Sequence, residues 1–370
     1  MDNNTLKNKI RGSLIGGAIG DALGYQIEFD IGVRDKQVTR FKDDLGIISD
    51  DTQMTLFTAN ALLWRHARWM INQESIHSHE AVYYGYLDWY DTQKRRGKND
   101  IVSIIKDIYL NTGKNYEHDP ICWIRNIPEL NKRQAPGNTC LSSLRSGKMG
   151  TINNPTNNSH GCGGVMRIVS CGLLYSFPDN AGYLAAECAA ITHGHPLSHM
   201  ASYMCAVIIS MLTYNNATID EAVNEALRLV QEKHDRFNDS NNSLSDLINL
   251  VNKAIELSKQ NISDPKAIKR IGEGWHAEDA LAIALYSCLK YPNSFKDAVI
   301  CAANHDGDSD STAAITGNIL GAYLGISAID QYYIDNVELK DVILEIADDL
   351  CEMVVNDEID KNSEWIRKYG

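Results

Sequence analysis

A short acidic segment in the last fifth of the chain carries the side chains best suited to metal chemistry. It reads Asn304-His305-Asp306-Gly307-Asp308-Ser309-Asp310-Ser311-Thr312, so three carboxylates fall within five residues. A run of apolar and small residues follows, which predicts a buried helix entered from an acidic loop. Burying such a cluster is costly unless a positive charge accompanies it. Because hard divalent cations prefer oxygen ligands, the segment indicates half of a metal site.

A second acidic turn, Ser49-Asp50-Asp51-Thr52, precedes apolar residues at helical spacing, so we expect a helix to begin near Asp51. Serine and aspartate are ordinary at a helix N-terminus, and capping alone explains one of them. Two adjacent aspartates exceed what capping requires. Together the two turns offer enough carboxylates and hydroxyls for two Mg²⁺-like ions, which would hold a substrate and activate a water molecule.

Three further polar features allow either a structural or a functional interpretation. Asp21 lies on a face of small residues and could be a buried hydrogen-bonding group, while Glu28 follows the end of the same expected helix. The glycine loop from Ser159 to Gly164 runs into an expected helix over 165–176, which is typical both of an anion site and of tight packing. His193, in a loop, is either a hydrogen-bonding residue or a ligand contact.

The elements that must position these residues are helices. The sequence shows no long apolar alternation, no internal repeat and no glycine fingerprint of a nucleotide-binding sheet, so we predict an all-α protein. A stripe of Tyr and Trp within 76–95 is typical of core packing. The expected helices span 5–25, about 51–64, 76–95, 139–144, 165–176, 181–193, 197–214, 218–236, 241–260, 276–290, 294–303, 312–325 and 339–356.

Bulk composition narrows the class of protein. The 370 residues are 44% hydrophobic and 22% charged, and no linker interrupts them, so we expect one domain over 1–370. A formal net charge of −13 argues against a nucleic-acid or anionic-membrane binder. The nine cysteines form no Cys-x-x-Cys pair, which favours reduced core residues. We identify no signal segment and no run able to span a bilayer, so a cytoplasmic location is expected.

Seven short motifs, taken in order along nearly the whole chain, resemble the ADP-ribosylglycohydrolase family. Each is nonspecific alone, whereas the ordered set is specific. They are Gly20-Asp21-Ala22-Leu23-Gly24, Ser49-Asp50-Asp51-Thr52-x-Met54, Ala135-Pro136-Gly137-Asn138-Thr139, Gly161-Cys162-Gly163-Gly164-Val165-Met166-Arg167, Thr192-His193-x-x-Pro196, Gly272-Glu273-Gly274-Trp275 and Asn304-His305-Asp306-Gly307-Asp308-Ser309-Asp310-Ser311.

The resemblance implies a compact orthogonal helical bundle with a centre of two divalent cations, Mg²⁺ or Mn²⁺. The resemblance thins near 66–130 and 228–270, where members of the family diverge. By position, it implies the metal ligands Ser49, Asp50, Asp51, Asp308, Asp310 and Ser311. It places ADP-ribose against Ser159, His160, Gly161, Cys162, Gly163, Gly164 and Met166, with His193, Trp275 and Glu28 near the substrate.

The expected reaction is hydrolysis of the N-glycosidic bond between ADP-ribose and a protein side chain. Asp310 or Asp51 is the expected base, and Glu28 is a third expected catalytic residue. The Asp-Ser-Asp-Ser form of the second acidic motif favours arginine linkages over serine linkages. ADP-ribosylated protein would be the substrate, ADP-ribose the product, and a toxin or transferase that attaches ADP-ribose a possible partner. Alternatives are a non-catalytic ADP-ribose binder, a phosphoester hydrolase, or an immunity or regulatory protein that occludes an ADP-ribosylating partner.

Overall fold

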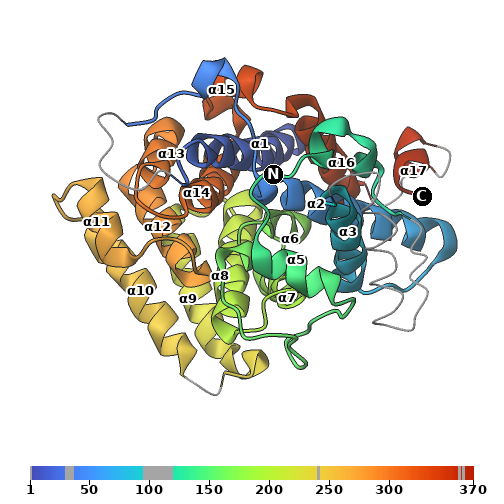
Figure 1. The fold of residues 1–370 in the computed structure, drawn as a ribbon, viewed down its shortest axis with the longest axis horizontal. Helices are drawn as coiled ribbons and strands as arrows, with labels where there is room; N and C mark the ends of the chain where they lie inside the picture. The colour runs from blue at the N-terminus through green and yellow to red at the C-terminus, as the bar shows by residue number, and fades with distance from the viewer. Residues whose placement is uncertain (1, 30–36, 95–119, 240–241, 357–359, 361–362) are drawn as a thin grey trace.

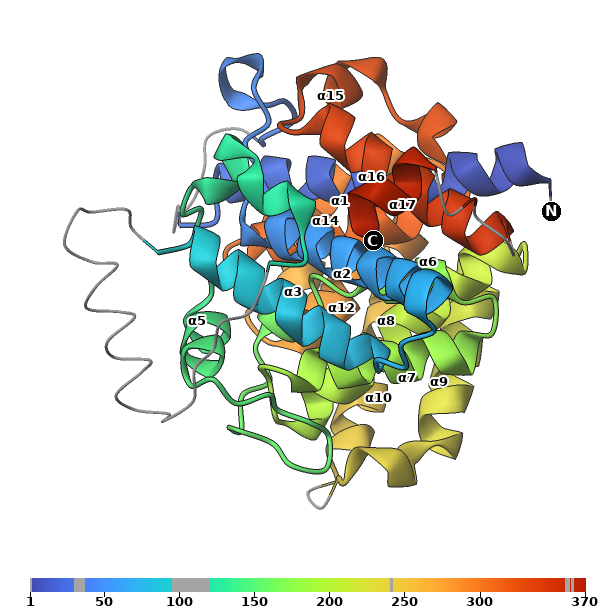
Figure 2. The ribbon, with the colours of Figure 1, turned by 90° about the vertical axis from the view of Figure 1, so that its right-hand side faces the viewer.

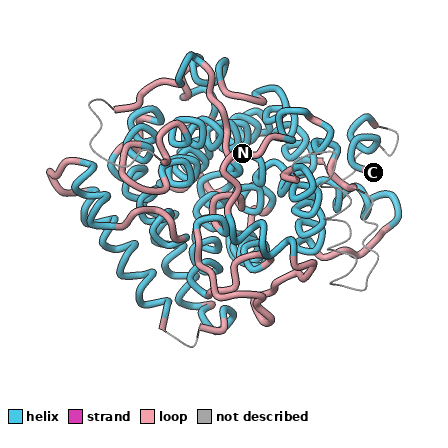
Figure 3. Tube along the Cα trace, in the orientation of Figure 1, coloured by secondary structure: helices cyan, strands magenta, loops and turns pink. Residues whose placement is uncertain are grey.

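The computed structural model describes residues 2–29, 37–94, 120–239, 242–356, 360 and 363–370. Helices dominate this part of the chain, and it contains no strand, only three isolated bridges between pairs of residues (Figure 3). The all-α prediction is therefore confirmed. The stripe of aromatic residues expected in the core is also confirmed, because Tyr83, Tyr86 and Trp89 are buried.

Most predicted helices occur, with ends displaced by a few residues. Three short helices, α11, α15 and α17, were not predicted, because segments of six to eight residues carry little periodicity. The α-helices are α1 (Asn3–Tyr25), α2 (Asp50–Asn72), α3 (Ser78–Thr92), α5 (Asn138–Arg145), α6 (Val169–Leu174), α7 (Pro178–Ala190), α8 (Pro196–Tyr214), α9 (Ile219–Glu232), α10 (Ser243–Ser258), α11 (Asp264–Ile271), α12 (Ala277–Lys290), α13 (Phe295–Ala303), α14 (Ser309–Leu324), α15 (Gln331–Asn336), α16 (Lys340–Val355) and α17 (Glu364–Tyr369).

Helices α1 and α14 pack closely and antiparallel, and the two lie together in both ribbon views (Figure 1, Figure 2). Glycines of α1 make this approach possible: a Cβ atom at Gly20 would lie 2.0 Å from the carbonyl oxygen of Ala313. At the end of the pair, the Ser309 hydroxyl donates to the Gly24 carbonyl oxygen over 3.0 Å. The packing brings the C-terminal end of α1 to the N-terminus of α14, where the acidic segment lies.

Helix α8 is apolar enough to satisfy a length and composition test for a membrane span, so the expectation that no run would do so is wrong. Its most apolar 18-residue window has a mean hydropathy of 1.3. However, 89% of that window is buried, and α8 packs against α7, α9, α6 and α14. Helix α8 thus serves as a core helix of the bundle, surrounded by protein on most of its circumference.

Two helix boundaries near the expected site differ from prediction. Helix α14 begins at Ser309 rather than at 312, so Asp310 and Ser311 belong to its first turn and Asp308 is its N-cap. Helix α6 begins at Val169 rather than at 165, because a 3₁₀ turn over Cys162–Gly164 intervenes. The glycine loop therefore does not open directly onto a helix N-terminus, which removes the helix-dipole argument for an anion site there.

Candidate metal centre

The N-terminus of α2 presents two buried carboxylates on successive residues. Ser49 is the N-cap, and its hydroxyl accepts a hydrogen bond from the Asp51 amide over 3.2 Å. Asp50 Oδ2 accepts from the Gly137 amide over 3.0 Å, which fixes that side chain toward the loop before α5. Asp51 Oδ1 is buried and has no hydrogen-bond partner among the described residues. Capping therefore uses Ser49 and leaves Asp51 with an unoccupied oxygen.

The N-terminus of α14 repeats this arrangement with a different cap. Asp308 Oδ1 accepts from the Ser311 amide over 3.3 Å, and the Ser311 amide also approaches Asp310 Oδ1 at 3.0 Å. Within the described chain, Asp308 Oδ2 has no partner although it is buried. The preceding turn is held by Gly307, whose φ of +141° suits glycine, and by the Asp308 amide, which donates to the Glu273 carbonyl oxygen over 2.8 Å.

Asp21 of α1 joins the two acidic helix ends. Its carboxylate accepts from the amides of Ser49, at 2.9 and 3.0 Å, and Thr52, at 3.1 Å, and from the Thr52 hydroxyl at 2.5 Å. Burial raises the pKa of Asp21 to about 7, and the nearby charge of Asp310 adds to the effect. Of the two roles left open by the sequence, the structure shows the structural one: Asp21 fixes the start of α2.

Glu28 completes a three-carboxylate group with Asp308 and Asp310. Each offers one oxygen, and these oxygens all lie within 4.8 Å of one another. Burial, followed by the charges of Asp310 and Asp308, raises the pKa of Glu28 to about 10. Glu28 Oε2 is buried and, within the part of the chain that is described, has no hydrogen-bond partner. These features are typical of carboxylates that a cation would neutralise.

The pKa values of the other acids support the same interpretation. Burial raises the pKa of Asp50, Asp51 and Asp308 well above the usual range. The neighbouring Asp310 carboxylate raises each further. Hydrogen bonds from Gly137 and Ser311 only partly oppose these shifts. Without a cation, several of these groups are neutralised by protons instead. The donor set, all oxygen with three unpartnered atoms, fits Mg²⁺ or Mn²⁺ better than a softer ion.

These acids line a cavity of about 660 Å³, a volume suited to a ligand of drug or nucleotide size. The same cavity is lined by the glycine loop, through Gly161, Cys162 and Gly163, and by Met166 and Trp275. Trp275 is 40% exposed, so an aromatic face is accessible at the rim. The cavity is thus lined by carboxylates, by the backbone of the glycine loop and by an aromatic side chain.

His193 lies at the inner wall as a buried, neutral imidazole. Burial and the nearby Arg167 cation lower its pKa well below the usual range. Its Nδ1 lies 2.8 Å from the Thr192 hydroxyl, which in turn accepts a hydrogen bond from Arg167 over 2.6 Å. The guanidinium of Arg167 also stacks 4.2 Å above the Tyr86 ring. This network orients the imidazole with Nε2 toward the glycine loop, near Gly161 and Gly163.

Not every residue that the resemblance assigned to the metal or substrate site lines this cavity. Ser49, Ser159, His160 and Gly164 do not line it. The hydroxyl of Ser49 serves as the cap, and the ring of His160 bonds to Glu278 instead. The remaining predicted site residues do line the cavity: Glu28, Asp50, Asp51, Gly161, Cys162, Gly163, Met166, His193, Trp275, Asp308, Asp310 and Ser311.

Sequence reasoning missed one wall of the cavity. The segment from Arg133 to Cys140 contributes most of it, and Phe29 adds an aromatic side chain that is 68% exposed. The motif Ala135-Pro136-Gly137-Asn138-Thr139 carried the signal, but its chemistry lies in backbone groups such as the Gly137 amide. Asp306, one of the three carboxylates of the acidic segment, is exposed and is not part of the lining.

The helical fold and the paired acidic helix ends define an all-α protein with an oxygen-lined site suited to divalent cations. More specifically, residues 2–359 match the ADP-ribosylglycohydrolase family, so the chain belongs to that family. A solved structure described as an ADP-ribosylglycohydrolase-related protein complex has the same fold. It covers 95% of this chain and 100% of its own, with a TM-score of 0.60 and 20% sequence identity.

Two curated relatives carry names that describe an activity. The ADP-ribosylarginine hydrolase Tri1 of Pseudomonas putida is 28% identical over 49% of this chain and 48% of its own length. The ADP-ribosylhydrolase ARH3 of Mus musculus is 23% identical over 49% of this chain and 53% of its own length. The aligned region thus spans about half the length of these relatives.

Proposed function

We propose that this protein is a metal-dependent hydrolase that removes ADP-ribose from modified protein side chains, with arginine as the preferred linkage. The observation that carries the proposal is the convergence of two acidic helix N-termini on one cavity, where buried oxygens of Asp51, Asp308 and Glu28 have no hydrogen-bond partner among the residues that the structure describes. Membership of the family and the names of its relatives support an ADP-ribose ligand.

Ser49, Asp50, Asp51, Asp308, Asp310 and Ser311 are the proposed ligands of two ions, Mg²⁺ or Mn²⁺. When bound, the ions would supply positive charge that keeps these acids ionised and oxygen-binding positions for ribose hydroxyls and water. Glu28, which lies within 4.8 Å of the nearest oxygens of Asp308 and Asp310, fits a role at the same centre.

The protein groups have separable tasks in this proposal. Asp310 or Asp51 accepts the proton of the attacking water molecule. The carboxylates around the ribose stabilise positive charge that develops as the bond from C1 to the guanidinium breaks. The glycine loop and Trp275 hold the rest of ADP-ribose, while neutral His193 contributes a hydrogen-bonding group without adding charge.

The preference for arginine rests on the Asp-Ser-Asp-Ser sequence of the second motif and on the name of the Pseudomonas putida relative. Two peptides that carry ADP-ribose on arginine or on serine provide the test. We expect Mg²⁺ or Mn²⁺ to support release of free ADP-ribose, faster from arginine, and EDTA to stop it.

Asp308→Asn and Asp310→Asn preserve side-chain size while removing charge, and we expect each to lower turnover at least about 100-fold. His79→Ala, which changes a histidine paired with Glu187 on α7, should leave turnover unchanged. Binding of ADP-ribose without release from either peptide would identify a non-catalytic binder. Release of inorganic phosphate would instead identify a phosphoester hydrolase.

A further inference from the structure

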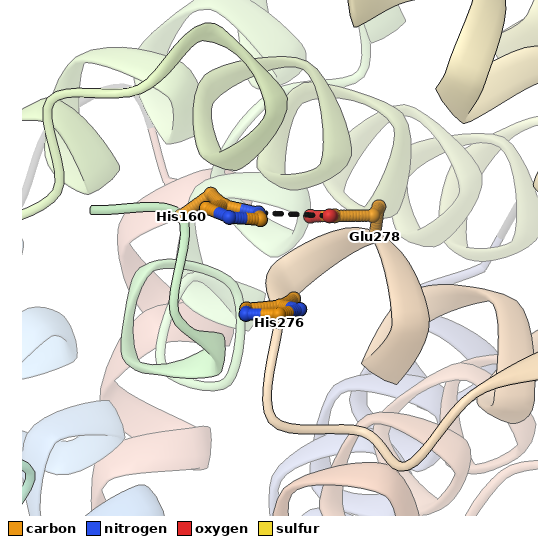
Figure 4. A group of neighbouring side chains, drawn as sticks. All are labelled: His160, His276 and Glu278. Atoms are coloured by element: carbon orange, nitrogen blue, oxygen red, sulfur yellow. Dashed lines mark hydrogen bonds and ion pairs between the residues drawn. The ribbon is translucent and has the colours of Figure 1, made fainter. Parts of the chain in front are cut away.

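A second cluster of candidate ligands lies outside the lining of the acidic cavity. His160 lies in the glycine loop, and His276 and Glu278 lie at the start of α12. Each offers one ligand atom, and these atoms lie within 4.8 Å of one another. Figure 4 shows both imidazole rings beside the Glu278 carboxylate. Two ring nitrogens and one carboxylate oxygen form a donor set unlike the all-oxygen set of Asp308, Asp310 and Glu28.

Glu278 anchors the cluster and keeps one oxygen available. Its Oε1 lies 2.8 Å from His160 Nδ1, the contact drawn as a dashed line in Figure 4. Its Oε2 is buried, and no described residue hydrogen-bonds to it. A buried carboxylate oxygen without a partner is costly in an apolar setting, whereas an ion bound there would satisfy it.

His276 is the ligand whose ring must change orientation when an ion binds. Its ring stacks on that of His160 with centroids 4.1 Å apart and planes 12° apart. The nitrogen lone pairs of stacked rings lie in two nearly parallel planes, so an ion shared by both rings requires the His276 ring to turn. The side chain is 51% exposed, and its Nδ1 lies 3.9 Å from Asp279 Oδ2, which is too far for a hydrogen bond, so this contact does not fix the ring.

The neighbouring His195 does not belong to the donor set. Its ring centroid lies 4.9 Å from that of His160, but its Nδ1 accepts a hydrogen bond from the Leu197 amide over 3.1 Å. His195 therefore caps α8, and this capping bond fixes the orientation of its ring.

We propose that His160, His276 and Glu278 form a second metal site that binds Zn²⁺, a borderline ion that accepts imidazole nitrogen and carboxylate oxygen together. Two histidines and a glutamate supply three of the four positions of a tetrahedral ion, and water fills the fourth on the exposed His276 side. Zinc binding at His160 Nδ1 replaces the hydrogen bond to Glu278 Oε1, and the neutral imidazole then carries its proton on Nε2.

The site joins two segments that both contribute to the walls of the acidic cavity. The Cys162 amide donates to the Trp275 carbonyl oxygen over 3.0 Å, and the Ala277 amide donates to the His160 carbonyl oxygen over 2.8 Å. A zinc ion held by His160 and His276 would fasten these segments at their adjoining residues. We therefore expect slower hydrogen exchange at the Cys162 and Ala277 amides when zinc is bound.

Isothermal titration of tag-free protein with Zn²⁺, in excess Mg²⁺ to occupy the acidic centre, tests the proposal. We expect wild-type protein to bind one zinc equivalent at this site, and His276→Ala and Glu278→Gln to bind it roughly 100-fold more weakly. His276 is exposed and Gln keeps the shape of Glu, so circular dichroism should show both variants folded.

His79→Ala is the matched control, because His79 also pairs with a carboxylate, Glu187, at 3.1 Å, but has no converging third ligand in the described chain. It should bind zinc as the wild type does. Asp308→Asn should also retain the site, which separates this proposal from the fate of the hydrolase activity. Equal zinc affinity in wild-type, His276→Ala and Glu278→Gln protein, or zinc binding lost only in Asp308→Asn, would overturn it.

Discussion

Asp21 is the residue on which the geometry of the acidic centre depends. One carboxylate holds two backbone amides and one hydroxyl at the start of α2, although Asp21 itself faces away from solvent completely. It therefore acts through Ser49 and Thr52, which flank Asp50 and Asp51, and we class it as a positioning residue. The sequence left this role open because a buried aspartate among small residues is typical of either a ligand or a structural hydrogen-bond acceptor.

Asp21→Ala is expected to destabilise the protein by about 2 to 5 kcal/mol, since the amides of Ser49 and Thr52 would lose their acceptor in a buried setting. Affinity for Mg²⁺ should fall with it, because α2 no longer has a fixed start. Thermal unfolding and calorimetric Mg²⁺ titration measure the two effects.

Thr52→Val serves as the control for Asp21→Ala. It removes the hydroxyl donor but keeps both amides bonded to Asp21, so we expect the free energy of unfolding to fall by only about 1 kcal/mol. An Asp21→Ala protein that unfolds at the wild-type temperature would show that the hydrogen bonds of Asp21 contribute nothing to stability.

At the scale of elements, the contact between α1 and α14 sets the distance between the acidic groups. Gly20→Ala tests this contact, because the added Cβ would meet a backbone carbonyl 2.0 Å away and force the helices apart. Alanine normally favours a helix over glycine by about 1 kcal/mol. Here we expect Gly20→Ala to lower the free energy of unfolding by about 1 to 3 kcal/mol and to weaken Mg²⁺ binding.

Gly137→Ala is a suitable comparison in thermal unfolding, since its φ is −58° and its nearest neighbours lie 3.8 Å or more from the new Cβ. Its unfolding temperature should change little. If Gly20→Ala raised the unfolding temperature, the close packing of α1 on α14 would have no energetic role.

The sequence was sufficient for the helices with strong periodicity and for the acidic ends of α2 and α14. It misplaced the start of α14 by three residues, because Asp and Ser are as typical of a loop as of a first helical turn. The start of α6 was also displaced, since a glycine-rich 3₁₀ turn has no pattern of its own. The zinc cluster was beyond prediction, because His160 and Glu278 are brought together only by tertiary packing.

For the whole molecule, the acidic centre links stability to pH and to metal. The pKa of Asp21 is raised from 3.8 to about 7, and that of Glu28 from 4.5 to about 10. Between pH 3.8 and about 7 for Asp21, and between pH 4.5 and about 10 for Glu28, the metal-free folded state binds more protons than the unfolded chain. Its free energy of unfolding therefore falls as the pH rises through these two ranges. A bound cation replaces the protons and should remove this loss.

We therefore expect EDTA to lower the unfolding temperature much more at pH 8 than at pH 5, relative to protein in Mg²⁺. A ligand at 100 times its dissociation constant raises the free energy of unfolding by about 2.7 kcal/mol, and we expect removal of Mg²⁺ at pH 8 to cost about this much. Differential scanning calorimetry at both pH values measures the difference. An EDTA effect as large at pH 5 as at pH 8 would contradict the proposed exchange of protons for metal.

The pairing of α1 with α14 also constrains when the centre can form during synthesis. Helix α1 precedes α14 by most of the chain, so it emerges from the ribosome earlier than α14. Until α14 is made, the glycine face of α1 has no partner and the acids of α2 face no second acidic end. A nascent chain that ends before Ser309 therefore cannot hold the complete site, because it lacks Asp310 and the helix against which α1 packs.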